Sequence, residues 1–250
     1  LASSIFYSSE TWLTCDLKCV QSTYRATLKQ LLGVRKSTPT DCLLIECGMP
    51  TAKAYIQSKQ LKFIKKLLAR DNFWESYIGK SLALAMHHKT PISRVVQALI
   101  DLPEDHNPSA VSLAECQNRI STSEKSRAKM YFYLNPSLSV SCVYSSSVIV
   151  PEYLRIAYSR IKLSSHRLRI ETGRWTRPIT PEADRICPCR EGVQSEEHVL
   201  LNCPLTAGLR DNTAALNVDP HVSELLTLSS YDAHEVCKLC FETLEYFSNL

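Results

Sequence analysis

Glycine is scarce in this chain, with 6 residues among 250, and the 12 prolines stand mostly at junctions between segments. A strand-rich fold with many tight turns is disfavoured, because such turns draw heavily on glycine and proline. No stretch approaches the roughly 18 to 20 continuous apolar residues that span a bilayer. The N-terminal residues also lack the basic and apolar regions of a secretory signal. We therefore expect a mainly α-helical protein with no membrane partner.

The composition of the whole chain is that of a globular protein, with 44% apolar and 22% charged residues. Its length fits one large or two modest domains. The 11 cysteines are odd in number and scattered, so we interpret them as reduced thiols of an intracellular protein, cytoplasmic or nuclear. The chain opens with Leu1 where an initiator methionine would stand, and we therefore expect a longer protein that begins upstream.

Apolar residues recur at helical spacing along most of the chain, and glycine or proline residues separate the expected helices. Gly33 and Gly48 are expected to end the first two helices. The expected helices cover 10–32, 40–47, 52–70, 73–88, 92–102, 112–134 and 151–171. These patterns predict an irregular helical bundle over 1–136, a serine-rich linker over 137–150, and a last part, 151–250, in which a basic helix precedes a small zinc-knuckle subdomain and closing helices.

One short stretch, 185–204, concentrates metal-ligating side chains. Cys187, Cys189, His198 and Cys203 have the spacing C-x-C-x8-H-x4-C, which supplies the four ligands of a closed tetrahedral structural Zn²⁺ site. Gly192 is expected to reverse the chain after the first two cysteines, and the residues from Ser195 to begin a helix that carries His198. The alternative is a set of buried cysteines without a metal. Two further cysteines, Cys237 and Cys240, fall in an amphipathic helical pattern and are expected to pack in a core.

Basic residues gather just before this cluster. The segment 152–190 contains nine basic residues, eight of them arginine, and only four acidic residues. Arginine is suited to bidentate phosphate contacts, and an indole stacks on an unpaired base. The candidate nucleic-acid-binding residues are Arg167, Arg169, Arg174, Trp175 and Arg177. The alternative is an arginine-rich helix end with Trp175 packed in the core.

Two stretches, in the same order, are similar to one known family. The run H-R-L-R-I-E-T-G-R-W-T-R-P (166–178), with R-I-C-P-C-R-E-G-V-Q-S-E-E-H-V-L-L-N-C-P after it, resembles the zinc-binding region that follows the polymerase of non-LTR (LINE-like) retrotransposon reverse transcriptases. The run L-K-Q-L-L-G-V-R-K-S-T-P-T-D-C-L-L-I-E-C-G-M-P (28–50) resembles the helical segment upstream of that region. The resemblance implies that the four cysteine and histidine residues are the family's zinc ligands, although the family more often has two residues between the first cysteines.

The same resemblance limits the activity that we expect. Reverse transcriptases hold two Mg²⁺ ions with aspartates that include an adjacent pair, and this chain has no Asp-Asp pair. The expected polymerase domain would lie upstream, outside this chain. We therefore expect no enzyme, but a zinc-containing fragment that binds RNA or DNA and positions RNA template or target DNA. The alternatives are a helical protein-interaction scaffold with a purely structural zinc loop, and a decayed element copy without activity.

Overall fold

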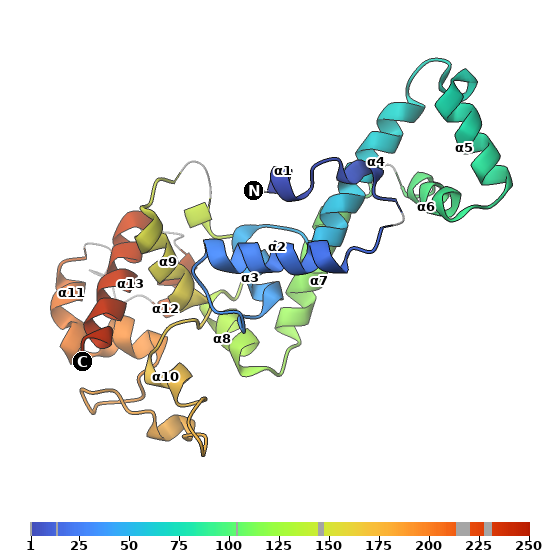
Figure 1. The fold of residues 1–250 in the computed structure, drawn as a ribbon. Helices are drawn as coiled ribbons and strands as arrows, with labels where there is room; N and C mark the ends of the chain where they lie inside the picture. Colours follow the sequence, from blue (N-terminus) through green and yellow to red (C-terminus); the bar gives the residue numbers. More distant parts are fainter. Residues whose placement is uncertain (1, 14, 104, 145–147, 214–220, 228–231) are drawn as a thin grey trace. The chain divides into compact units, whose positions relative to one another are not determined.

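The computed structural model describes residues 2–13, 15–103, 105–144, 148–213, 221–227 and 232–250. Over these residues the chain is built from helices joined by turns and loops and contains no β-strand (Figure 1). The predicted mainly α-helical class is therefore confirmed. The chain divides into two compact units, each made of two sequence segments: unit 1 is Leu1–Ala26 with Met49–Glu115, and unit 2 is Thr27–Gly48 with Cys116–Leu250. None of the described helices is long and apolar enough to cross a bilayer.

Unit 1 is a set of helices that begin at well-formed caps. The side chains of Thr51, Ser76 and Thr90 each accept a hydrogen bond from a backbone N–H of the first turn that follows, which satisfies one unpaired donor there. A small core joins Leu61 and Ile64 to Val96 and Leu99. The helices are α1 (Ala2–Ile5), α4 (Ala52–Leu68), α5 (Tyr77–His87) and α6 (Pro91–Ile100), and the first residues of α2 (Lys18–Leu31) and α7 (Pro108–Ser121) also belong to this unit.

Unit 2 holds the larger core. In it α9 (Glu152–Lys162) packs against α13 (Ala233–Ser248), as Figure 1 shows, and Tyr158 and Ile161 of α9 belong to the same buried core as Cys240 of α13. Cys237 and Cys240 are both buried there, so their predicted core positions are confirmed. The other helices of this unit are α3 (Thr40–Cys47), α8 (Ser126–Leu134), α10 (Arg169–Thr172), α11 (Ala207–Asp211) and α12 (Val222–Thr227).

A charged pair lies inside this core. The ammonium Nζ of Lys162 is 3.2 Å from Glu46 Oε2, and both side chains are almost completely buried. The hydroxyl of Tyr131 donates to the same carboxylate at 2.9 Å, and Lys162 also donates to the hydroxyl of Tyr158. Buried charges need such partners, because the interior does not replace the hydration that they lose. The pair fixes α3 beside α9 within unit 2.

Two glycine helix ends were predicted correctly. Gly33 and Gly48 both have a positive φ, of 61° and 62°, in the left-handed region that glycine adopts without strain. Several helix boundaries were predicted wrongly. The helix expected from residue 10 begins at Lys18, the one expected over 112–134 is broken into α7 and α8, and the one expected over 151–171 ends at Lys162. The break after α7 contains adjacent serine and threonine residues, whose hydroxyls compete for backbone hydrogen bonds.

The serine-rich stretch 137–150, expected as a linker, falls within unit 2. Its residues 145–147 lie outside the described part of the chain. Leu138 and Val143 are buried, and the backbone N–H of Ser141 donates to the carbonyl oxygen of Glu46 at 3.1 Å. The described residues near its start therefore pack into unit 2, where the apolar side chains of Leu138 and Val143 are buried.

Candidate metal centre

The first two cysteines lie on a tight reversal of the chain. Ile186 and Val193 form an antiparallel bridge, and inside it the N–H of Cys187 donates to the carbonyl of Gly192 at 2.7 Å. The residue that takes the left-handed conformation is Arg190, with φ 68°. The chain reverses here with Gly192 inside the reversal, as predicted, although Gly192 itself does not have a positive φ. The single-residue gap of Cys187-Pro188-Cys189 is accommodated in this reversal.

His198 lies on the helical segment that follows, and Cys203 lies directly at the end of that segment, as predicted. Helical conformation begins at Glu196, and the N–H of His198 donates to the hydroxyl of Ser195 at 3.2 Å. Over His198–Asn202 the helix widens to a π-turn, and the N–H of Cys203 donates to the carbonyl of His198 at 2.7 Å. In such a wide turn residues five apart lie on one side. His198 and Cys203 therefore face the reversal together.

The four side chains converge on one point. Their ligand atoms all lie within 4.8 Å of one another, with Cys187 Sγ 3.7 Å from Cys203 Sγ and Cys189 Sγ 3.2 Å from His198 Nε2. A tetrahedral metal ion with metal–sulfur bonds of about 2.3 Å places two sulfur ligands roughly 3.8 Å apart. The cluster therefore has the spacing and the donor atoms to hold a metal ion.

Burial makes the four ligands unequal. Cys187 and Cys203 are buried, whereas Cys189 and His198 are half-buried. Burial raises the pKa of the Cys187 thiol to about 12, so without a metal this thiol keeps its proton. Burial also opposes ionisation of Cys189, but the backbone N–H of Glu191 and the neighbouring thiols together lower its pKa. Burial lowers the pKa of His198, which favours the neutral imidazole that a metal requires.

A buried acidic side chain, Glu196, attaches the helical segment 196–202, here called the metal helix, to the rest of unit 2. Glu196 Oε1 accepts hydrogen bonds from the hydroxyl of Ser164 at 3.1 Å and from Nε2 of His166 at 2.9 Å. Burial alone would raise the pKa of the Glu196 carboxyl, but His166 and these hydrogen bonds outweigh it and lower that pKa. A second link runs from the backbone N–H of Arg169 to Gln194 Oε1 at 2.8 Å. The turn before α10 and α10 itself are therefore bonded to the metal centre.

The predicted nucleic-acid-binding residues take different positions around this centre. Arg167, Arg169, Trp175 and Arg177 are exposed, and Arg169 also donates to the carbonyl of Ile186 at 2.7 Å. Trp175 is 48% exposed and does not pack in the core.

Arg174 differs from the other four. Its guanidinium forms an ion pair with Glu171 at 3.0 Å and donates to the hydroxyl of Ser126. The same carboxylate pairs with Arg127 at 3.0 Å. Arg174 therefore holds α10 beside the start of α8, and the contacts found for it are structural.

Two basic residues near this group were not singled out from the sequence. The guanidinium carbon of Arg35 lies 3.9 Å from the ring centroid of Trp175, a cation–π contact between residues 140 positions apart. Arg160 lines the same cavity as Arg35 and Arg167. Arg160 belongs to the basic segment noted in the sequence, but nothing in the local pattern around Arg35 signals its partner.

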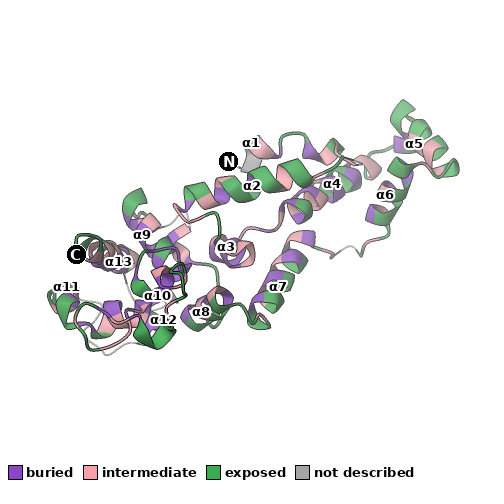
Figure 2. Ribbon diagram, turned by 60° about the horizontal axis from the view of Figure 1, so that its bottom comes forward, coloured by how far each residue is buried: buried purple, intermediate pink, exposed green. Residues whose placement is uncertain are grey.

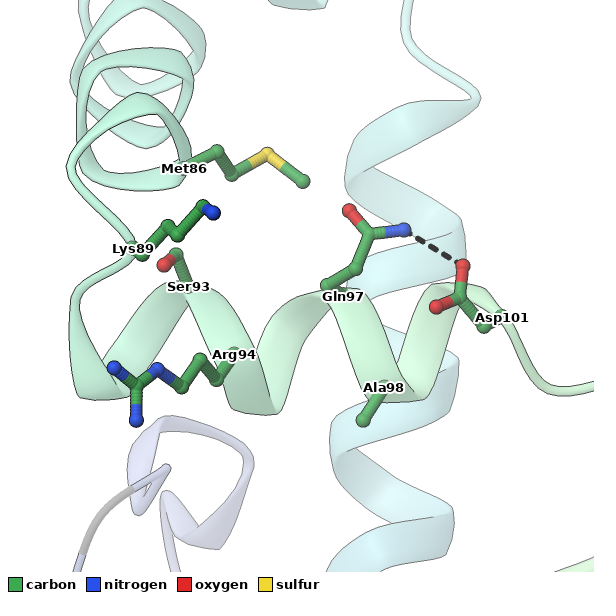
Figure 3. A pocket seen from close by; sticks show the side chains of 7 residues that line it. All are labelled: Met86, Lys89, Ser93, Arg94, Gln97, Ala98 and Asp101. Atoms are coloured by element: carbon green, nitrogen blue, oxygen red, sulfur yellow. Dashed lines mark hydrogen bonds between the residues drawn. The ribbon is translucent and has the colours of Figure 1, made fainter.

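Unit 1 contains a cavity of another kind, of about 340 Å³, between α5 and α6 (Figure 3). Met86 lies on one side, and on the other the amide of Gln97 donates to Asp101 at 2.6 Å. The cationic side chains of Lys89 and Arg94 also line this cavity. It contains none of the predicted site residues.

No protein-family model, curated protein or solved structure matches this chain.

Proposed function

We propose that the chain is a noncatalytic, zinc-containing nucleic-acid-binding module, derived from the post-polymerase region of a LINE-like reverse transcriptase protein. It would hold RNA template or target DNA beside a polymerase located upstream. The observation that carries the proposal is a four-ligand metal centre bonded directly to a short segment with exposed arginines and an exposed tryptophan. Arginine clusters and zinc knuckles together are typical of nucleic-acid-binding proteins.

Zinc is the metal that the donor set favours. Three thiols and one imidazole are borderline-soft ligands, and four protein ligands at tetrahedral spacing fill the coordination shell of Zn²⁺. A filled shell leaves no position for water or substrate, so the role is structural. Zinc would fix the reversal that carries Ile186, whose carbonyl orients Arg169.

The exposed side chains supply the two contacts that a single strand needs. Arg169 and Arg177 are exposed and suited to phosphate oxygens. Trp175 has Arg35 over its ring and is 48% exposed, which leaves part of its surface for stacking on an unpaired base. This combination fits single-stranded or structured RNA better than regular duplex, whose bases are already stacked.

Titration of the zinc-loaded full chain with fluorescent single-stranded RNA, followed by anisotropy, tests the proposal. Affinity should fall steeply between about 50 and 200 mM salt, because phosphate contacts release counterions. The double substitution Arg169→Gln/Arg177→Gln should weaken binding and make the salt dependence shallower by about two ion equivalents.

The matched control is Arg25→Gln/Arg70→Gln, which removes two exposed arginines of unit 1. It should weaken binding much less than the first pair does. Binding that is absent, or insensitive to salt, would contradict the nucleic-acid function. Single-stranded DNA of the same sequence decides which nucleic acid is preferred.

A protein-interaction scaffold has one observation in its favour. On α5, Tyr77 is 87% exposed and Ile78 59% exposed, and Gly79 is the buried residue of this helix. Figure 2 shows that most of α5 is exposed. Exposed apolar clusters of this kind often mark protein contacts. If RNA is not bound, comparing the chain with its Tyr77→Ser/Ile78→Ser variant by light scattering tests whether this face makes a protein contact with a second copy.

A further inference from the structure

A cavity of about 420 Å³ lies in unit 2, apart from the metal ligands themselves. Four short pieces of chain form its wall: the turn after α2, the last residues of α9, the turn at 165–167 and the last turns of α13. Ser165 and His166 are buried parts of this wall. The cavity is therefore formed by tertiary packing of segments far apart in the sequence.

The charge around this cavity is strongly positive. Arg35, Arg160 and Arg167 line it, and the acidic residue among its lining side chains is Glu245. Within the part of the chain that the structure describes, no ion pair is found for any of the three arginines. Three guanidinium groups and one carboxylate give the cavity lining two more positive than negative charges.

Two of these arginines are held in place by hydrogen bonds that leave other donors available. Arg35 Nη2 donates to the carbonyl of His166 at 2.5 Å, and Arg160 Nε donates to the carbonyl of Gly33 at 2.9 Å. Arg35 Nη1 is buried and has no hydrogen-bond partner. A buried N–H without a partner costs free energy of folding unless a ligand or water satisfies it. Anchored guanidinium groups with spare donors are typical of anion sites.

The electrostatics of Arg35 agree with this geometry. Burial lowers the pKa of its guanidinium, and the charges of Arg127, Arg167 and Arg160 lower it further, with Glu171 opposing them. Positive charges are therefore concentrated at this point at a cost to the folded chain. An anion in the cavity would relieve that repulsion.

We propose that this cavity binds the terminal phosphate of a nucleic-acid strand. The inference rests on the proposed nucleic-acid function and adds a specific ligand to it. A terminal phosphomonoester carries about −1.5 to −2 charges at neutral pH, which matches the two unbalanced positive charges, whereas an internal phosphodiester carries one. A strand end enters a concave site, while an internal phosphate has a nucleoside on each side.

Trp175 favours a nucleic acid over a phosphorylated peptide. The Arg35 guanidinium that lines the cavity also lies over the Trp175 ring, so a nucleotide attached to the bound phosphate has an aromatic ring within reach. The metal centre supports the wall as well, because His166 of the cavity is hydrogen-bonded to Glu196 of the metal helix. The site thereby links the strand end to the zinc knuckle.

The test compares three single-stranded RNAs of one sequence, with a 5′-phosphate, a 3′-phosphate or hydroxyls at both ends, on the zinc-loaded full chain. One phosphorylated end should bind about tenfold more tightly than the hydroxyl form, the effect of a charged hydrogen bond. Arg167→Gln, at an exposed position in the cavity wall, should remove most of that preference, and the matched Arg70→Gln should not.

Glu245→Gln gives a test in the opposite direction. It removes the negative charge of the wall, so it should strengthen the preference for the phosphorylated end, which a misfolded variant would not do. Equal binding of all three RNAs would overturn the inference and leave the proposed function standing. Absence of binding to every RNA would contradict the function and the inference together. A phosphoserine peptide that binds as tightly as the phosphorylated RNA would overturn the assignment to a strand end.

Discussion

The four candidate metal ligands differ in how far solvent reaches them, and this decides which substitution is most informative. Cys203 is completely buried and its Sγ is 3.7 Å from Cys187 Sγ, while Cys19 is exposed on α2. Cys203→Ser should abolish stoichiometric zinc binding, because a hydroxyl is a poor zinc ligand at this position. Cys19→Ser should keep one zinc per chain. Elemental analysis of the purified chain gives the ratio, and full zinc content in Cys203→Ser would show that Cys203 is no ligand.

The thiols outside the metal centre should differ in reactivity for a reason visible in their surroundings. Burial raises the pKa of Cys42 and of Cys237 to about 12 each, so at pH 8 only about one thiol in ten thousand is the reactive thiolate. Iodoacetamide should therefore modify the exposed Cys15 and Cys19 and spare these two in the folded chain. Peptide mass mapping checks the sites. Equal modification of Cys42 and Cys19 in native buffer would contradict the burial of Cys42.

Single residues also show where sequence reasoning succeeds and where it stops. The four metal ligands could be grouped from spacing alone, since they lie within one short stretch and local hydrogen bonds bring them together. The contact of Arg35 with Trp175 could not be foreseen, because it depends on how distant segments pack. Arg174 gave a local hint, because Glu171 stands three residues before it and the turn at the end of α10 brings the two together, with the N–H of Arg174 donating to the carbonyl of Glu171.

At the scale of the elements, the buried pair of α3 and α9 should be the most sensitive point of unit 2. Glu46→Gln leaves the ammonium of Lys162 buried without a counter-charge, which should lower the free energy of unfolding by about 3 to 5 kcal/mol. Replacing both residues, as Glu46→Gln/Lys162→Met, should recover much of this loss because no unpaired charge remains buried between α3 and α9. Urea denaturation followed by circular dichroism measures both. An unstable double variant and a stable single variant would refute the argument.

The helices themselves were easier to predict than their ends. Apolar periodicity and glycine ends placed α3 correctly, because each of those signals is local. The break after α7 had a local signal that the periodicity concealed: the hydroxyls of Ser121 and Thr122 both donate to the carbonyl of Asn118. The end of α9 depends on a distant partner, since Ser164 has φ 47° and donates to Glu196. No local pattern contains that partner.

For the whole molecule, the main difference from the sequence-based picture is that unit 2 is not one continuous segment. It needs Thr27–Gly48 as well as Cys116–Leu250, because Glu46 of α3 balances Lys162 and Arg35 contacts Trp175. A fragment that began at residue 151 would leave Lys162 buried without its carboxylate. Hydrophobic patterns identify helices but not which segments share a core, so this discontinuity had no signal in the sequence.

The two units should respond differently to loss of the metal. Among the described residues, the group of side chains suited to a metal lies in unit 2, and the three tryptophans divide between the units: Trp12 and Trp74 in unit 1, Trp175 in unit 2. In a Trp12→Phe/Trp74→Phe variant, a chelator should therefore shift the urea midpoint reported by Trp175 strongly downward.

The size of this shift follows from linkage. Metal present at a hundred to a thousand times its Kd stabilises the folded state by about 3 to 4 kcal/mol, and the chelator removes that contribution. The complementary Trp175→Phe variant reports unit 1 through Trp12 and Trp74, and its midpoint should move much less. Equal shifts in the two variants would mean that the metal stabilises the chain as one cooperative whole. No shift in either would mean that the four ligands hold no stabilising metal, and the structural role proposed for zinc would then fail.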